Sequence, residues 1–406
     1  MGGGNDSSKG NNSIREIIGS RVHLYRFPRR YEIIQKVRSF GSFDEISFPK
    51  ASAGSEELAG ADFSDEQSSD SSSYFHQNSL LDSLILAEWE SKSDQNLFRY
   101  DVTACPTHTI PGSYGFIAQL NEGRASKKRP TEFQVDKVIQ PFDDSKFNFC
   151  KAKQSEILFA FEESNTGSSD FNEAYVASGS PNLVLINVSP IEYGHILLVP
   201  RVLDNLPQLV NPDTLLLALQ FAHEVNNPYM RVGYNSLGAY ATINHLHFQA
   251  YYLSAAMPLE RARTSLISKK DCGKSIIRIE RLVEYPVHGL VFESGGDLKD
   301  MAKLIGTLCE NLSLRNIPHN MLIVDKGARV FVIPNAFSQK KARNELPQDV
   351  LDSQVDPAVF EISGHQLMKR KEDYDGLSEQ WVLDMLRCAC IEDDTFETVI
   401  QLACAT

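Results

Sequence analysis

Two histidines and a glutamine alternate with apolar residues in the run His245-Leu246-His247-Phe248-Gln249. Because the side chains of a β-strand point to alternating faces, a strand here places both imidazoles and the carboxamide on one face. A neutral imidazole is a nucleophile or a base, and a carboxamide offers both donors and an acceptor. The spacing therefore predicts a site of nucleophilic chemistry on one face of a strand.

Two other interpretations fit the same run. The first is a half-exposed strand with two solvated histidines, which accounts for the alternation about equally well. The second is a metal site, since alternating histidines chelate metal ions, but no third and fourth ligands are spaced nearby. The context of the run has to decide among the three.

Polar residues also stand at intervals before the histidines. Asn187 ends an apolar run, Asn235 lies in a polar turn at 233–238, and Thr242 stands three residues before the first histidine. Residues 187–200 read NVSPIEYGHILLVP. In this order the blocks resemble the histidine-triad superfamily. Its pattern is a strand, a Pro-x-x-x-Gly-His turn, a strand, a helix, and a strand with His-φ-His followed by φ-His or φ-Gln.

Gln249 in the third place resembles the galactose-1-phosphate uridylyltransferase branch rather than the hydrolases with three histidines. The blocks at 233–253, 115–133 and 360–365 resemble the plant GDP-L-galactose phosphorylases, and the resemblance runs from about 80 to 405. It implies a nucleotidyltransferase that converts GDP-L-galactose and phosphate to L-galactose 1-phosphate and GDP, in ascorbate synthesis.

The resemblance also implies roles for the histidine run. His247 attacks the α-phosphorus, hexose 1-phosphate leaves, and inorganic phosphate then releases GDP from guanylyl-His247. Gln249 donates an amide N–H to a non-bridging phosphate oxygen, and His245 orients the site through hydrogen bonds. Asn187 and Thr242 match positions that contact ribose and phosphate. Asn235 matches a turn asparagine, although its spacing to the histidines is about one residue short.

A basic run with no acid, RASKKRP, occupies residues 124–130. Such runs are usually solvated loops. The uridylyltransferases carry a similar run near the phosphates, so we expect Arg124, Lys128 and Arg129 to clamp phosphate oxygens. Glu361 is expected to bond a sugar hydroxyl, with a purely structural glutamate as an equal alternative.

Three alternatives to the main hypothesis remain. A GDP-D-glucose phosphorylase of the same superfamily would use the same chemistry on another sugar. A triad hydrolase would release GMP, and Gln249 argues against it. A nucleotide-binding regulatory protein with an inactive site is disfavoured by the intact histidine and glutamine set.

Composition limits the cofactors and partners that can be expected. The seven cysteines form no Cys-x-x-Cys pair, and the Cys pair of the uridylyltransferase zinc site is missing, so we expect no metal and no cofactor, with phosphate as co-substrate. The net charge of −13 disfavours nucleic acid, and no apolar run reaches membrane-spanning length. The expected partners are a GDP-hexose and phosphate. We expect a monomer or homodimer in the cytoplasm, with the nucleus as a second location.

The elements that must position these residues are readable from hydrophobic periodicity. Helices are predicted at 79–92, 212–226, 297–316 and 377–391, and strands at 115–120, 155–161, 182–187, 195–200, 230–237 and 244–253, with two more around Gly327 within 320–334. This pattern favours an α+β fold, a triad-like open antiparallel sheet with packed helices, built from two fused halves. The run VFVIPN at 330–335 echoes ILLVPR at 196–201 and hints at a duplication.

The N-terminal part has a different composition. Residues 51–74 contain eight serines, six acids and no base, which predicts a flexible linker inside a mostly disordered extension over 1–78. We expect a catalytic half at 79–260 that carries the histidine run, and a second, degenerate half at 261–406. Nearly half of the negative charge therefore lies away from the site.

Overall fold

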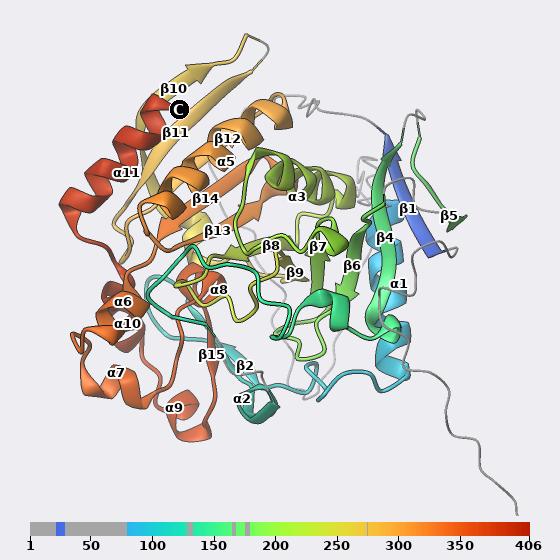
Figure 1. The fold of residues 1–406 in the computed structure, drawn as a ribbon. Helices are drawn as coiled ribbons and strands as arrows, with labels where there is room; N and C mark the ends of the chain where they lie inside the picture. Colours follow the sequence, from blue (N-terminus) through green and yellow to red (C-terminus); the bar gives the residue numbers. More distant parts are fainter. Residues whose placement is uncertain (1–21, 29–78, 128–132, 165–167, 175–178, 274) are drawn as a thin grey trace, which may run out of the picture. The chain divides into compact units, whose positions relative to one another are not determined.

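A computed structural model describes residues 22–28, 79–127, 133–164, 168–174, 179–273 and 275–406. Within these ranges twelve strands form one large sheet, antiparallel throughout except for the parallel pair β1 and β4 (Figure 1). The strands follow in spatial order: β10 (Arg263–Asp271), β11 (Ile276–Val283), β12 (Leu290–Ser294), β14 (Arg329–Pro334), β13 (His319–Val324), β8 (Met230–Asn235), β9 (Phe248–Tyr252), β7 (Ile196–Val199), β6 (Asn182–Ile186), β4 (Ile157–Ser164), β1 (Val22–Pro28) and β5 (Asp170–Ala174).

Helices cover both faces of this sheet. One face packs against α1 (Leu80–Asp94), α3 (Pro212–Val225), α5 (Leu298–Leu314) and α11 (Asp393–Ala405). The other face packs against α4 (Pro258–Arg261), α6 (Phe337–Ala342), α7 (Gln348–Asp352), α8 (Val359–Ser363) and α10 (Glu379–Ala389). A small sheet of β15 (His365–Met368), β3 (Ile117–Leu120) and β2 (Thr107–Thr109) lies on this second side, with α2 (Glu122–Lys127) and α9 (Lys371–Asp375) beside it. The predicted α+β class is confirmed.

Alternation along the strands builds the two cores. In β6, Val184 and Ile186 belong to the cluster under α3 and α5, whereas Leu183 and Leu185 pack with Phe149 on the opposite face. Phe149 belongs to a short 3-10 turn, η2 (Phe149–Lys151), and similar turns occur at η3 (Gln154–Glu156), η4 (Val202–Asp204) and η5 (Asp325–Gly327). The face that carries Leu185 is the one that holds the cavity described below.

Local signals explain why several predicted helices form where expected. The side chain of Asn211 accepts from Thr214 N–H, and Thr214 Oγ1 accepts from Asn211 N–H, a reciprocal cap followed by Pro212 at the first helical position. The apolar stripe of α3 then packs against α5 (Figure 1). Ser378 caps α10 by accepting from Trp381 N–H.

The same strand order occurs twice. The order β6-β7-β9-β8, with α3 between β7 and β8, matches β11-β12-β14-β13, with α5 between β12 and β13. Strands β8 and β13 meet antiparallel at the centre, where Asn235 pairs with Asn320. The sequence echo between 196–201 and 330–335 is not this repeat, because it aligns β7 with β14, whose positional counterpart is β9. Short apolar runs that end in proline recur too easily to mark equivalent strands.

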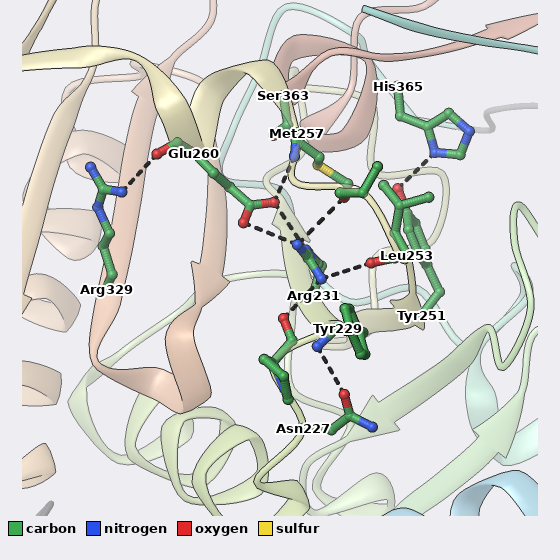
Figure 2. Close-up of polar contacts among 12 residues, drawn as sticks. Asn227, Tyr229, Arg231, Tyr251, Leu253, Met257, Glu260, Arg329, Ser363 and His365 are labelled. Carbon is green, nitrogen blue, oxygen red and sulfur yellow. Dashed lines mark hydrogen bonds and ion pairs between the residues drawn. The ribbon is translucent and has the colours of Figure 1, made fainter. Parts of the chain in front are cut away.

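A buried ion pair between Arg231 and Glu260 lies beside the seam where β8 and β13 meet (Figure 2). Arg231 of β8 donates from Nε to Glu260 Oε1 at 2.9 Å and from Nη2 to Oε2 at 3.1 Å. Arg329 of β14 donates to the backbone oxygen of Glu260 at 2.7 Å. Glu260 of α4 thus connects strands from both repeats. The predicted division at residue 260 falls within α4 and stays a prediction.

Three expectations about elements were wrong or incomplete. The fold was expected to begin near Ser79, yet residues 22–28 form β1 between β4 and β5, with Leu24, Tyr25 and Phe27 buried. The histidine strand was expected over 244–253, but β9 begins at Phe248, because Leu246 N–H bonds Leu206 of a loop instead of a strand. Several further elements, among them the strands β10, β11 and β12 and the helix α11, were not predicted. The expected linker at 51–74 lies outside the described residues.

Within the described ranges, every helix is too short or too polar to cross a lipid bilayer.

Candidate functional site

A cavity of about 430 Å³ opens on the sheet face opposite α3 and α5. Its walls come from β6, β7, β8 and β9, from α8 and β15, from the start of α2, and from the segments at 147–149 and 240–243. Seven of the predicted site residues line it: Arg124, Asn187, Asn235, Thr242, His247, Gln249 and Glu361. His245 is fully buried behind this wall, and Lys128 and Arg129 lie outside the described residues.

The ring of His247 is held in one tautomer. Its Nδ1 lies 2.9 Å from the backbone oxygen of His245, and a carbonyl only accepts, so Nδ1 carries the proton. The lone pair is therefore on Nε2. Burial lowers the pKa of His247 to about 4, and its hydrogen bond to the His245 backbone only partly offsets this. At neutral pH the ring is uncharged, which is the nucleophilic form.

The peptide of His247 is held by a side chain rather than by a strand. Gln208, which is fully buried, accepts from His247 N–H at 3.0 Å and donates to His247 O at 3.1 Å. The same amide nitrogen donates to Asn235 O at 2.9 Å. Gln208 thus bridges β8 and the segment before β9, and it is a residue that the sequence reasoning missed. No motif marks it, because its partners are backbone groups.

His245 has a different role from its neighbour. Its Nδ1 accepts from Phe149 N–H at 3.1 Å, and its ring lies against Phe142 and Phe149. Burial, followed by the proximity of His247, lowers its pKa to about 4. The His245 ring supports the segment at 147–149, and its backbone oxygen fixes the proton of His247, while the orienting role of the side chain stays a prediction.

Gln249 stands next to the fully buried His195. Nδ1 of His195 accepts from Ile191 N–H at 2.8 Å, so its proton is on Nε2. Burial and the nearby Arg124 lower the pKa of His195, and a side-chain hydrogen bond with Gln249 partly offsets them. With its proton on Nε2, the ring suits the oxygen of the Gln249 amide as acceptor, which leaves the amide NH₂ for another partner. Nδ2 of Asn187 also lies 3.3 Å from Nε2 of His195, so two of the predicted site residues meet at this ring.

Cationic groups reach the cavity from two directions. Arg124 of α2 donates its backbone N–H to Asn121 Oδ1 at 2.9 Å, and its guanidinium donates to Ser189 O. Lys369 follows β15 and lies 3.5 Å from Asp356. Arg99 also lines the cavity, and neither Arg99 nor Lys369 was singled out from the sequence, because they are isolated from the basic run.

A chain of buried asparagines supports the far wall. Asn235 Oδ1 accepts from Asn320 Nδ2 at 2.7 Å and from Val359 N–H at 2.9 Å. Asn320 Oδ1 in turn accepts from Asn335 at 2.8 Å. The oxygen of Asn235 is therefore used within the protein, and a contact with substrate would run through its amide nitrogen. Glu361 is buried on α8 at the same end of the cavity.

Among the described residues, no group of three or more His, Cys, Asp or Glu side chains is arranged to hold a metal ion. The expectation of a metal-free reaction remains a prediction.

Two family models together match most of the chain. The model described as GDPGP1-like, N-terminal domain, matches residues 80–251, and the model described as GDPGP1-like, C-terminal domain, matches residues 258–406. The chain belongs to the GDPGP1-like family. The histidine run and Gln208 fall within the first match, and the helix with Glu361 falls within the second.

Relatives of this GDPGP1-like chain include two kinds of phosphorylase. GDP-L-galactose phosphorylase 2 of Arabidopsis thaliana is 52% identical over 326 residues, which cover 79% of this chain and 75% of that relative. GDP-D-glucose phosphorylase 1 of Homo sapiens is 32% identical over 314 residues, which cover 74% of this chain and 77% of that relative. The resemblance to the GDP-L-galactose phosphorylases is confirmed.

A solved structure shares the fold. The crystal structure of yeast Ap4A phosphorylase Apa2 in complex with Ap4A superposes with a TM-score of 0.51 at 13% identity, covering 77% of this chain and 97% of that chain. At this identity the likeness concerns the fold alone.

Proposed function

We propose that this chain is a GDP-L-galactose phosphorylase, which forms L-galactose 1-phosphate and GDP through a guanylylated histidine. One observation carries the proposal: His247 lines the cavity uncharged, with its proton fixed on Nδ1 by the His245 carbonyl and its lone pair on Nε2. The relatives named GDP-L-galactose phosphorylase are more similar to the chain than those named GDP-D-glucose phosphorylase, which supports the choice of sugar.

In the first step, Nε2 of His247 forms a bond to the α-phosphorus. The bond from that phosphorus to the bridging oxygen breaks, and hexose 1-phosphate leaves with the electron pair. The ring becomes cationic, so its Nδ1–H bond to the His245 oxygen is strengthened. An oxygen of inorganic phosphate then attacks the same phosphorus, the P–N bond breaks, and GDP is released with neutral His247 restored.

The other groups bind and orient. The NH₂ of Gln249, turned away from His195, donates to a non-bridging oxygen of the transferred phosphoryl group. Arg124, together with Lys128 and Arg129, offsets the phosphate charge, and no metal ion is required. Asn187 bonds the ribose, Thr242 contacts phosphate, and Glu361 bonds a sugar hydroxyl. We place the reaction in ascorbate synthesis in the cytoplasm, with the protein as a monomer or homodimer.

The test is to incubate the protein with GDP-L-galactose, with and without inorganic phosphate, and to separate the nucleotide products. GDP should appear only with phosphate, and His247→Ala should abolish it. Release of GMP by water would support a hydrolase instead. Tight GDP binding without turnover would support a regulatory protein. Comparison of kcat/KM for GDP-L-galactose and GDP-D-glucose decides between the two phosphorylases.

A covalent intermediate gives a second readout. Without phosphate, substrate labelled in the guanosine moiety should leave acid-labile, base-stable label on the wild-type protein and none on His247→Ala. The absence of label on the wild type would exclude the covalent mechanism.

A further inference from the structure

One wall of the cavity is apolar. Phe147, Phe149, Leu185 and Leu197 line this wall and belong to one packed cluster on the site face, and the ring of Phe149 also lies 5.1 Å from that of His247. Glu156, at the end of η3, lines the cavity beside them and is half-buried. The catalytic proposal above uses none of these residues as a ligand contact.

The strand pairing indicates how many strands separate Glu156 from Gln249. Ile157, the residue after Glu156, pairs with Leu185, Leu185 pairs with Leu197, and Leu197 pairs with Gln249. Three strand separations amount to about 14 Å between the backbones of Ile157 and Gln249. Side chains occupy part of this span, and an extended nucleoside 5′-phosphate can bridge the remainder. A nucleotide with its phosphate at Gln249 therefore brings its base to Glu156.

The opposite end of the cavity is distinct. Gly233 pairs with Gln249 on the side away from Leu197, and the side chains of Val359 and Phe360 of α8 lie against it. Asp356 and Glu361 therefore line the part of the cavity beyond Gln249, where the sugar would lie. Glu156 is the carboxylate of the other end among the described lining residues.

Charge and hydrogen-bond geometry then select the base. A carboxylate repels phosphate, so its favourable partner in a nucleotide is an uncharged group that donates hydrogen bonds. The Watson–Crick edge of guanine presents N1–H and N2–H side by side, which match the two oxygens of one carboxylate in the way that a guanidinium does. Adenine places an acceptor, N1, at the same point, and hypoxanthine lacks the N2 donor. The rings of Phe147 and Phe149 on the apolar wall suit a stacked base.

We propose that Glu156 binds the N1–H and N2–H groups of guanine and is the residue that selects GDP-hexoses over other nucleotide sugars. This inference rests on the proposed function for the identity of the substrate class. It assigns guanine recognition to one side chain that no motif marks.

The experiment measures binding of GDP, IDP and ADP by calorimetry to the wild type, Glu156→Ala and Glu156→Gln. IDP differs from GDP only by the missing N2 amine. The wild type should bind GDP about tenfold more tightly than IDP, since a hydrogen bond to a charged group is worth about that factor. It should bind GDP about a hundredfold more tightly than ADP. In Glu156→Ala, the affinity for GDP should fall to the affinity for IDP. The affinity for IDP should itself fall by a smaller factor than the affinity for GDP.

Glu163→Gln is the matched control, because Glu163 is an exposed glutamate of neighbouring β4 that does not line the cavity. It should keep the wild-type preference for GDP. Glu156→Gln retains one acceptor and the same size, so it should fall between the wild type and Glu156→Ala even if the alanine variant is poorly folded. An unchanged ratio of GDP to IDP affinity in both Glu156 variants overturns the inference.

Failure of the proposed function is distinguishable from failure of this inference. If the wild type does not phosphorolyse GDP-hexoses but the base preference is lost in Glu156→Ala, the catalytic proposal fails and the recognition stands. If phosphorolysis proceeds and the preference survives in both Glu156 variants, the recognition fails alone.

Discussion

The side-chain amide of Gln208 hydrogen-bonds both backbone groups of His247, at 3.0 Å and 3.1 Å. It does so one residue before β9 begins, where the neighbouring strands no longer hold the segment. Tyr234 fixes Gln208 in turn, by donating to its backbone oxygen at 2.8 Å. The position of His247 thus depends on a side-chain carboxamide, which supplies the hydrogen bonds that a neighbouring strand would otherwise make.

We expect Gln208→Met, which keeps the volume and removes the hydrogen bonds, to lower kcat about a hundredfold with a small change in KM. A displacement of the nucleophile by about 1 Å costs roughly this factor. Steady-state kinetics with a GDP-hexose and phosphate provide the measurement. Gln220→Met is the control, because Gln220 is a buried glutamine of α3 outside the cavity. Equal kcat values for the two variants would show that Gln208 has no positioning role.

The second prediction concerns the pH dependence of guanylyl transfer. Burial holds the pKa of His247 at about 4, so the nucleophile stays neutral down to about pH 5. An imidazole with the ordinary pKa near 6.5 would be about nine-tenths protonated at pH 5.5. Single-turnover formation of guanylyl-His247 should therefore proceed at nearly the same rate at pH 7.5 and pH 5.5. A tenfold fall over that interval would contradict the depressed pKa.

The third prediction concerns the free energy of unfolding, which should depend on pH over the range in which the rate of guanylyl transfer does not. Burial lowers the pKa of His245, His247, His319 and His365 to about 4, whereas in the unfolded chain they titrate near 6.5. Between pH 6.5 and 4 the unfolded chain binds more protons, so stability falls as the pH falls, by about 1.4 kcal/mol per pH unit for each histidine. Above pH 7 these groups contribute no slope.

Urea unfolding at pH 7, 6 and 5 measures this slope. His319→Gln should reduce it by the share of one histidine, since the variant has one fewer group that protonates on unfolding. His319 lies outside the cavity lining, which leaves the site chemistry out of the comparison. The same slope in both proteins would contradict the assignment.

Sequence reasoning identified residues that line the cavity more readily than the residues that hold them in place. The spacing of His247 and Gln249 predicted one shared face, and both line the cavity. Neither the spacing nor the resemblance indicated Gln208, because a side chain that binds backbone groups leaves no pattern in residue types. The basic run was noticed for its charge density, yet Arg99 and Lys369, which also line the cavity, stand alone in the sequence.

Long elements with strong periodicity were also predicted more accurately than short ones at the sheet edges. Helix α3 starts at Pro212 as its cap and apolar stripe require. Strand β1 was missed because seven residues with a buried Tyr25 and Phe27 sit in a basic context that resembles a tail. Its burial depends on pairing with β4, more than a hundred residues away, and pairing of this kind is not encoded locally.

A fourth prediction tests whether His195 acts through Gln249. His195→Phe removes the Nε2–H that selects the oxygen of the Gln249 amide, so the amide should rotate and kcat should fall about tenfold. In a Gln249→Ala background the same change should have little further effect, because the amide that it orients is absent. A double-mutant cycle on kcat measures this coupling. Additive losses would mean that His195 acts through its other contacts, with Ile191 N–H and Asn187, and not through Gln249.

The last prediction concerns the ion pair of Arg231 and Glu260, whose side chains are 4% and 12% exposed. Arg231→Met leaves Glu260 buried without its partner and removes the donors to Pro228 and Leu253 backbone oxygens (Figure 2). Breaking such a pair from one side typically costs about 3–5 kcal/mol. Arg263→Met is the control, because Arg263 and Glu284 form an exposed pair that should contribute less than about 1 kcal/mol.

Adding Glu260→Met to Arg231→Met distinguishes the charge from the packing. If the loss comes mainly from the unpaired carboxylate, the double variant should recover a large part of the stability, since well-packed apolar groups often replace a buried pair at little cost. The recovery should stay incomplete, because the backbone oxygens that Arg231 bound remain without those donors. Free energies of urea unfolding for the wild type, both single variants and the double variant give the coupling. A double variant less stable than Arg231→Met would place the main role of Glu260 in its contacts with Met257 N–H and Arg329.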